Sequence, residues 1–316
     1  MASCSKMSHY LMSAWFAKCA RLPHDAVRFP TVIFFRLLLT LLFIALAATG
    51  FARADELISI RGAQVAAEPV TAASAQIKRD TGLEFRIVTE GGSGGAVGAI
   101  GEDVVDVALL SRKVSPREHA AWPDKKFTEA QFGEQALLVV VPEPVWKAGV
   151  HAISKEQLRG IYESRVKNWK ALGGEDRKII FYNRDTRSSA WELLMFFLYD
   201  DTRKAPPIEA EVLTDASDVT TAVEYNGGSI SVLEYNAERP AAVHVLGIRL
   251  DDGSVVEATP KNIVSGKYEL ARPLVIATAR KPAGKVRRFV EFMLSPAGQA
   301  FVKKTGHIPN AELGTE

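Results

Sequence analysis

The chain has 316 residues, of which 47% are hydrophobic and 24% are charged, a composition typical of a globular protein with one large domain or two smaller ones. Six basic residues and one acid lie in residues 1–54, which leaves 33 basic and 36 acidic residues after position 54. The slight positive net charge therefore comes from the N-terminal segment, so the remaining chain lacks the basic excess of a nucleic-acid-binding protein. We expect no nucleic-acid partner.

Residues 1–54 have the order of a leader with a signal peptide. Two arginines precede the apolar run LLLTLLFIALAA (37–48), and small residues in an A-x-A arrangement follow it. The alternative is an uncleaved membrane anchor, but the run is shorter than the ~20 residues that span a bilayer. We predict cleavage between Ala54 and Asp55 and a periplasmic mature protein.

The side chains of the mature chain offer little to an enzyme or a metal site. Both cysteines, Cys4 and Cys19, lie in the leader, which excludes disulfides, thiolate zinc sites and cysteine nucleophiles from the mature protein. Its histidines show no metal-ligand spacing, and no G-x-S-x-G nucleophile motif occurs. We therefore expect no catalytic residues, no metal and no cofactor, and a protein that is not an enzyme. The histidines in question are His119, His151, His244 and His307.

Short apolar runs alternate with amphipathic segments after the leader, which predicts an α/β fold with largely parallel sheets. The predicted strands are 57–62, 83–90, 105–111, 134–143 and 178–183. The predicted helices are 69–82, 95–102, 154–163, 187–200, 283–293 and 296–305. Ser154 and Gln157 form a capping-box pattern, and the Asp252-Gly253 pair predicts the turn of a hairpin over 248–258.

A glycine cluster, EGGSGGAVGAIG (90–101), follows the strand predicted over 83–90 and opens a helix. It is not a dinucleotide fingerprint, because Val97 stands where the third glycine of G-x-G-x-x-G belongs, and no lysine follows as a P-loop requires. Two interpretations stay open. Backbone N–H groups, Gly94 among them, and the Ser93 hydroxyl hold a small oxyanion, or the segment is a plain glycine-rich turn.

The segment YNRDTRSSAWELL (182–194) is the second candidate. Arg184 ends a predicted strand, and Ser188 and Ser189 stand at the start of a helix. An arginine fork with hydroxyls and free N–H groups suits a tetrahedral oxyanion. The alternative is an N-cap serine with a surface arginine. Arg187 is the weaker candidate because it adjoins the cap.

In the order and spacing of six segments, the sequence resembles the periplasmic phosphate-binding proteins of ABC transporters, a branch of the type II solute-binding fold. The resemblance covers nearly all of residues 57–310. The segments are GGSGGAVGAIGEDVVDVALLSR, LRGIYESRVKNWKALGG, NRDTRSSAWELLMFF, GSISVLEY, YELARPLVI and FVEFMLSPAGQAFVKKTGHIP.

This resemblance implies two α/β lobes joined by a hinge, with the ligand in the cleft between them. The first lobe would be discontinuous, 55–142 plus 266–316, and the second would be 143–265. It also implies capture of a small oxyanion, most often phosphate, for uptake through the permease subunits of an ABC transporter. A monomer is expected.

The chain departs from the family pattern at the anion ligands. The first loop has Val65 and Ala66 where relatives have a threonine, and Ser111 or Leu110 stands where phosphate binders have an aspartate. The family's S-G-T triplet is here Ser188-Ser189-Ala190. A sensor or accessory binding protein with a degenerate anion site is therefore the alternative function. The predicted oxyanion ligands are Ser93, Gly94, Ser111, Arg184, Ser188 and Ser189.

Overall fold

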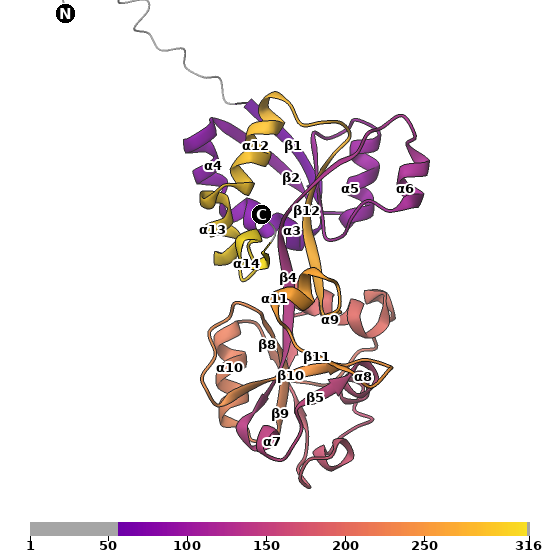
Figure 1. Cartoon of the computed structure of the whole chain (residues 1–316), viewed down its shortest axis with the longest axis vertical. Helices are drawn as coiled ribbons and strands as arrows, with labels where there is room; N and C mark the ends of the chain where they lie inside the picture. The colour runs from indigo at the N-terminus through magenta and orange to yellow at the C-terminus, as the bar shows by residue number, and fades with distance from the viewer. Residues whose placement is uncertain (1–55, 315–316) are drawn as a thin grey trace, which may run out of the picture. The chain divides into compact units, whose positions relative to one another are not determined.

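Strands and helices alternate along the computed structural model, which describes residues 56–314 (Figure 1). The predicted signal peptide and its cleavage point lie outside the described residues. The strands are β1 (Glu56–Gly62), β2 (Leu83–Val88), β3 (Val107–Leu110), β4 (Thr128–Pro142), β5 (Ala152–Ser154), β6 (Ile180–Phe181), β7 (Asn183–Arg184), β8 (Val212–Leu213), β9 (Ser229–Glu234), β10 (Val243–Arg249), β11 (Val255–Val256) and β12 (Ala271–Thr278). The α-helices are α3 (Gln64–Ala72), α4 (Ser74–Thr81), α5 (Gly92–Gly101), α6 (Pro116–Ala121), α7 (Glu143–Lys147), α8 (Lys155–Tyr162), α9 (Ser189–Tyr199), α10 (Ala216–Tyr225), α11 (Pro260–Val264), α12 (Gly284–Leu294), α13 (Pro296–Lys304) and α14 (Asn310–Leu313). Two 3₁₀ helices are η1 (Trp169–Leu172) and η2 (Thr202–Lys204).

Most predicted elements occur in the structure, with shifted ends. The capping box at the start of α8 is confirmed, because Ser154 Oγ accepts from the Gln157 N–H and the Gln157 side chain accepts from the Ser154 N–H. The predicted hairpin is the antiparallel pair of β10 and β11, with Gly253 at φ 84° in its turn. The segment predicted as one helix over 69–82 is two helices, because α3 packs on α13 and β3 while α4 packs on β2 and α12.

The prediction of largely parallel sheets is wrong. β1 pairs in parallel with β2 and β3, as expected for strands joined through helices. The long strands β4 and β12 then run antiparallel to each other, and β4 is also antiparallel to β9 and β10. The main sheet has the order β11-β10-β4-β12-β3-β1-β2, so it is mixed.

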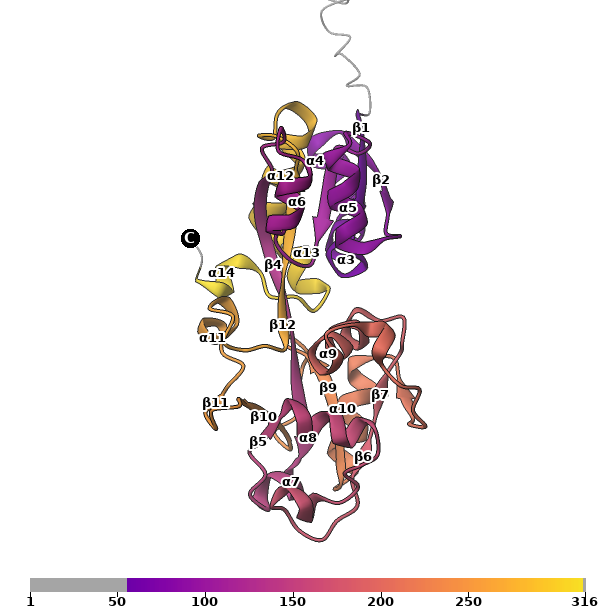
Figure 2. The ribbon, with the colours of Figure 1, turned by 90° about the vertical axis from the view of Figure 1, so that its right-hand side faces the viewer.

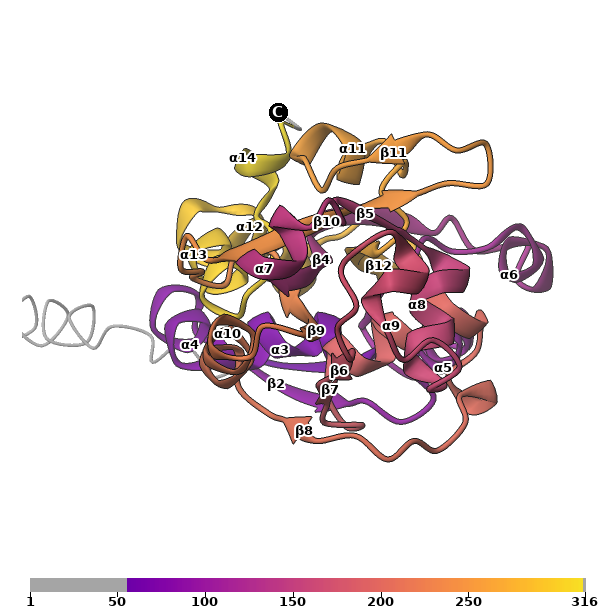
Figure 3. The same cartoon turned by 90° about the horizontal axis from the view of Figure 1, so that it is seen from below.

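The fold has two lobes, as the sequence predicts. Figures 1 and 2 show β1–β3 with α3–α6, α12 and α13 on one side, and β5–β11 with α7–α10 on the other. In the second lobe, seen from below in Figure 3, α8 and α9 lie on one side of the β4–β9–β10 sheet and α10 lies on the other. Each lobe thus covers its sheet with helices on both faces, the usual arrangement of an α/β layer.

The strands β4 and β12 connect the lobes. Phe132 of β4 packs in the core of the first lobe with Ile58 and Phe289, whereas Leu137 and Val139 of the same strand pack in the core of the second lobe. The whole of β12 pairs with residues 128–136 of β4, with a bulge between Leu274 and Val275. Because β4 contributes to both cores, the lobe limits at 142 and 266 stay a prediction.

The segment that contains Asn168 and Trp169 has a structural role. Asn168 caps η1 by accepting from the Lys170 N–H, and Trp169 is fully buried with its indole N–H donating to the Gly228 carbonyl at 2.9 Å. Gly173 ends η1 with φ 85°, a left-handed conformation that favours glycine. None of the helices within residues 56–314 combines the length and the hydropathy needed to cross a membrane.

Candidate functional site

The glycine cluster forms the N-terminus of α5. Gly91 and Gly92 have positive φ angles of 86° and 54°, so the chain turns sharply from β2 into the helix where a side chain would be strained. The first N–H groups of a helix have no intrahelical partner, and the helix dipole favours an anion there. The structure therefore retains the geometry expected for an anion at this loop.

Ser93 and Ser111 meet at this helix end. The Ser111 N–H donates to Ser93 Oγ at 3.0 Å, and the two hydroxyl oxygens lie 3.2 Å apart. Ser111 follows directly after β3, whose carboxyl end lies beside the N-terminus of α5. Two predicted ligands from separate segments thus lie side by side.

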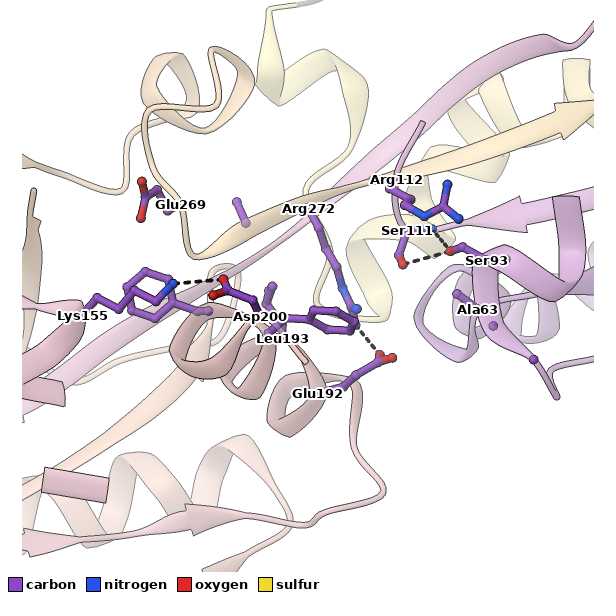
Figure 4. Close-up of a pocket in the computed structure, with 16 residues that line it drawn as sticks. Ala63, Ser93, Ser111, Arg112, Lys155, Glu192, Leu193, Asp200, Glu269 and Arg272 are labelled. Atoms are coloured by element: carbon purple, nitrogen blue, oxygen red, sulfur yellow. Dashed lines mark hydrogen bonds and ion pairs between the residues drawn. The ribbon is translucent and has the colours of Figure 1, made fainter. Parts of the chain in front are cut away.

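A cavity of about 670 Å³ opens beside this pair and is lined from both lobes (Figure 4). The first lobe contributes Ser93, Gly94 and Ser111, and α9 of the second lobe contributes Glu192 and two phenylalanines. Its charged lining residues are Arg112, Lys155, Glu192, Asp200, Glu269 and Arg272. A cleft with walls from two lobes is a usual place for a small ligand.

Arg272 is the most enclosed cation of this cavity. Its Nε donates to Gln135 Oε1 at 2.8 Å, and its Nη2 donates to Glu192 Oε2 at 2.7 Å and to the Ser189 carbonyl at 3.3 Å. Its Nη1 makes no hydrogen bond within residues 56–314. Figure 4 shows the side chain crossing the cavity towards Glu192. Three hydrogen bonds therefore fix the position of the guanidinium, and its Nη1 can still donate to a ligand.

Two further cations of the cavity wall have carboxylate partners. Arg112 binds Glu118 with both terminal nitrogens, at 2.8 and 2.7 Å, and this contact lowers the pKa of Glu118 to about 2. Lys155 lies 3.1 Å from Asp200. These pairs fix the rim of the cavity and leave it nearly neutral in charge.

Arg184 lies elsewhere. It is buried, and its two terminal nitrogens bind the carboxylate of Glu234 at 3.0 and 2.8 Å and the carbonyls of Val232 and Thr214. Its Nε is buried and has no partner within residues 56–314. Arg184 does not line the cavity and its remaining donor, Nε, is enclosed by protein, so its role as a ligand stays a prediction.

Ser188 and Ser189 already make protein contacts and do not line the cavity. Ser188 is the N-cap of α9, as the alternative interpretation held, because its Oγ accepts from the Trp191 N–H at 3.1 Å. Ser189 Oγ accepts from Gln135 Nε2 at 3.1 Å and donates to Glu68 Oε2 at 3.3 Å. Both hydroxyls are thus engaged, and their role as ligands stays a prediction.

The sequence analysis did not single out four residues that link α3, β4, α9 and β12. They are Glu68, Gln135, Glu192 and Arg272. Burial raises the pKa of Glu68 to about 7, against the opposing effects of the Ser189 hydrogen bond and the Arg272 charge. The available signal was a charged residue, Arg272, inside the apolar run of 270–276, since a buried arginine in a strand needs partners. The identity of those partners was not readable, because they are distant in the sequence.

Comparison with known proteins places this geometry in a family. The family model described as "PBP superfamily domain" matches residues 47–297. The phosphate-binding protein PstS of Bacillus subtilis (strain 168) is 26% identical over 269 residues, covering 84% of this chain and 85% of the relative. The PstS protein of Borreliella burgdorferi is 27% identical over 235 residues, covering 70% of this chain and 79% of the relative.

A solved structure supports the same fold. The crystal structure of a possible phosphate-binding protein from Planctomyces limnophilus superposes with a TM-score of 0.71 at 22% identity, covering 83% of this chain and 96% of that one. At this identity the likeness concerns the fold. With the family match over most of its length, the chain belongs to the PBP superfamily and has the two-lobed fold of the periplasmic binding proteins.

Proposed function

We propose that this protein is a substrate-binding protein that captures a small oxyanion, phosphate first, for uptake by an ABC transporter. The observation that carries the proposal is the N-terminus of α5, where Ser93 and Ser111 meet at the wall of a cavity lined from both lobes. Relatives named phosphate-binding proteins match this chain over most of its length. They favour a transport receptor over a sensor with a degenerate site, and a binding protein over an enzyme.

In the proposed complex, the anion binds against the first turn of α5. The hydroxyls of Ser93 and Ser111 and the N–H of Gly94 are the donors on this wall. Arg184, Ser188 and Ser189 are proposed to complete the site from the second lobe. Hinge closure along β4 and β12 would bring the lobes together, as in other periplasmic binding proteins.

The cellular setting is part of the same proposal. We propose export to the periplasm by the signal peptide, cleavage between Ala54 and Asp55, and action as a monomer. The transmembrane partner would be the permease subunits of the transporter. The leader sequence supports the export, and the similarity to PstS phosphate-binding proteins supports the association with a transporter.

Calorimetric titration of the protein, refolded to remove any bound anion, tests the function. We expect saturable binding of one phosphate per chain. Ser93→Ala should weaken it by about tenfold, because a hydroxyl to an anion contributes about 1.5 kcal/mol or more. Ser217→Ala, an exposed serine of α10 outside the cavity, is the matched control. If neither phosphate nor sulfate releases or absorbs heat in a saturable way, the protein is not an oxyanion receptor.

A further inference from the structure

A second cavity, of about 750 Å³, lies entirely within the second lobe. It shares no lining residue with the cavity between the lobes. Its lining comes from the sheet face of β4, β5 and β10, the end of α7, and the segments around β11 and the start of α11. Nothing in the proposed oxyanion function uses it.

The floor of this cavity is a part of the sheet that no helix covers. Helix α10 packs on β4 and β9, where Leu138, Val140 and Leu233 form a core cluster with α10. Residues of β10 alternate between the two faces, and Val245 pairs with Val140 of β4, so Val245 and Gly247 continue the face that carries Val140. Val245 packs at the edge of the α10 cluster and Gly247 lies outside it. Both residues line the cavity and form its floor.

Residues next to this floor extend it and form the walls of the cavity. Ala152 of β5 pairs with Gly247 and carries the floor outward. The side chain of Val255 contacts Gly247, because a Cβ atom at that glycine would be only 2.5 Å from Val255 Cγ1. Trp146 also lines the cavity, and its ring centroid lies 4.3 Å from that of His151 and 5.0 Å from that of His244. The result is a preformed apolar floor with an aromatic wall.

Two arginines on the wall have no carboxylate partner within residues 56–314. Arg249 makes no side-chain hydrogen bond or ion pair there. Arg239 donates only to the carbonyls of its own turn, Tyr235 and Ala237, at 3.3 and 3.4 Å. By contrast, Arg112, Arg184 and Arg272 each bind a glutamate. With Glu257, the two arginines give the acidic and basic side chains of this lining a net charge of +1.

We propose that this cavity binds an organic monoanion with an apolar body, of the aromatic carboxylate class. The apolar body lies on the floor beside Trp146, and the carboxylate binds Arg239 and Arg249. An arginine suits a carboxylate because its planar fork gives two parallel hydrogen bonds. The volume is in the range of small-molecule sites. The ligand differs from an inorganic oxyanion, for which the apolar floor offers no partner.

Titration with 2-naphthoate, followed by calorimetry, tests the proposal. We expect one saturable site in the wild-type protein, and binding at least tenfold weaker for the uncharged analogue 2-naphthamide. Arg249→Gln should weaken 2-naphthoate binding by about tenfold, and Ala152→Phe should abolish it by filling the floor. Arg187→Gln should change nothing, because Arg187 is exposed, is bound to Asp185 and does not line this cavity.

The outcomes separate this site from the oxyanion site. Saturating phosphate should leave the affinity for 2-naphthoate unchanged, and the Arg249→Gln variant should bind phosphate as the wild type does. Competition by phosphate would place the naphthoate in the other cavity and overturn the proposal. Equal affinities for wild type and Arg249→Gln, or no saturable binding, would also overturn it. Melting temperatures of the variants exclude a folding defect as the cause.

Discussion

Arg184 holds a positive charge in the interior of the second lobe, and the carboxylate of Glu234 neutralises it through two hydrogen bonds. A buried charge is tolerated only with such a partner, so the two side chains form a unit. An anion that reaches Arg184 would compete with Glu234 for the same guanidinium. The carboxylate thereby sets how strongly the arginine can bind a ligand.

We therefore expect opposite effects from changes to the two partners. Arg184→Ala should weaken phosphate binding at least tenfold, because a charge-assisted hydrogen bond is worth about 1.5–3 kcal/mol. Glu234→Gln should strengthen it, because the change removes a competing negative charge. Phosphate titrations of both folded variants measure these effects.

Arg187→Ala is the matched control. Arg187 is close in sequence, but it is solvent-exposed and bound to Asp185. If Arg184→Ala and Arg187→Ala weaken phosphate binding equally, Arg184 is not a ligand. The same conclusion follows if neither Arg184→Ala nor Glu234→Gln changes phosphate binding.

For single residues, the sequence predicts contacts that follow from adjacent βα units but not contacts between residues that are distant in the chain. Ser93 and Ser111 are predictable neighbours because adjacent βα units bring strand ends and helix starts to one edge. Arg272 meets Gln135 and Glu192 over separations of 137 and 80 residues, which no local pattern encodes. Arg184 is predictable as a functional candidate, but its pairing with Glu234, 50 residues away, is not.

Among the elements, α8 shows a helix start that the sequence specifies fully. The Ser154 hydroxyl and the Gln157 side chain satisfy each other's backbone N–H groups at 3.1 and 2.9 Å. The helix then buries Leu158 and Ile161 in the core of the second lobe. The cap therefore supports a helix that the core needs.

Ser154→Ala should lower the free energy of unfolding by about 1 kcal/mol, the usual contribution of an N-cap serine. Urea titration followed by circular dichroism measures the change, and the slope with urea should stay constant. Ser217→Ala, whose hydroxyl makes no hydrogen bond within residues 56–314, should shift the stability by less than about 0.5 kcal/mol. A loss of stability no larger for Ser154→Ala than for Ser217→Ala would show that the cap contributes nothing.

The strand β4 shows the limit of such prediction. The apolar pattern predicts a strand from residue 134, but the strand begins at Thr128. Only Ala130 and Phe132 of the six added residues have apolar side chains, and Gln131 Nε2 donates to Glu134 Oε2 at 2.7 Å. The antiparallel partner β12 supplies the backbone hydrogen bonds there, so the strand continues without an apolar pattern.

In the whole molecule, the connection between the lobes contains buried groups that can take up or release protons. Burial raises the pKa of Glu134 to about 8, and burial is also the main cause that raises the pKa of Glu68 to about 7. Burial, and then the nearby charge of Arg272, lowers the pKa of His307 to about 4. His307 and Glu68 are close to each other, with His307 Nε2 3.7 Å from Glu68 Oε2.

These shifts determine how the free energy of unfolding changes with pH. An acid whose pKa is raised in the folded state stabilises fully below its unfolded pKa, near 4.5, and loses this contribution as the pH rises through its folded pKa. A histidine whose pKa is lowered contributes above about pH 6.5 and loses its contribution as the pH falls towards 4. From about pH 6.5 to 8, the two acids therefore determine the slope, and stability should fall with rising pH.

The last part of this fall is due mainly to Glu134, because Glu68 is already about half ionised at pH 7 and nearly fully ionised at pH 8. Each titrating group contributes up to about 1.4 kcal/mol per pH unit. We expect Glu134→Gln to abolish most of the fall between pH 7 and 8, since the amide still accepts the Gln131 hydrogen bond but carries no proton to lose. Urea titrations at half-unit pH steps measure this, with Glu175→Gln, an exposed glutamate, as the control. If the wild-type protein keeps a constant stability from pH 6.5 to 8, or if Glu134→Gln falls as steeply as the control, the buried acids between the lobes do not titrate in this range, and the stability of the two-lobed structure is independent of them.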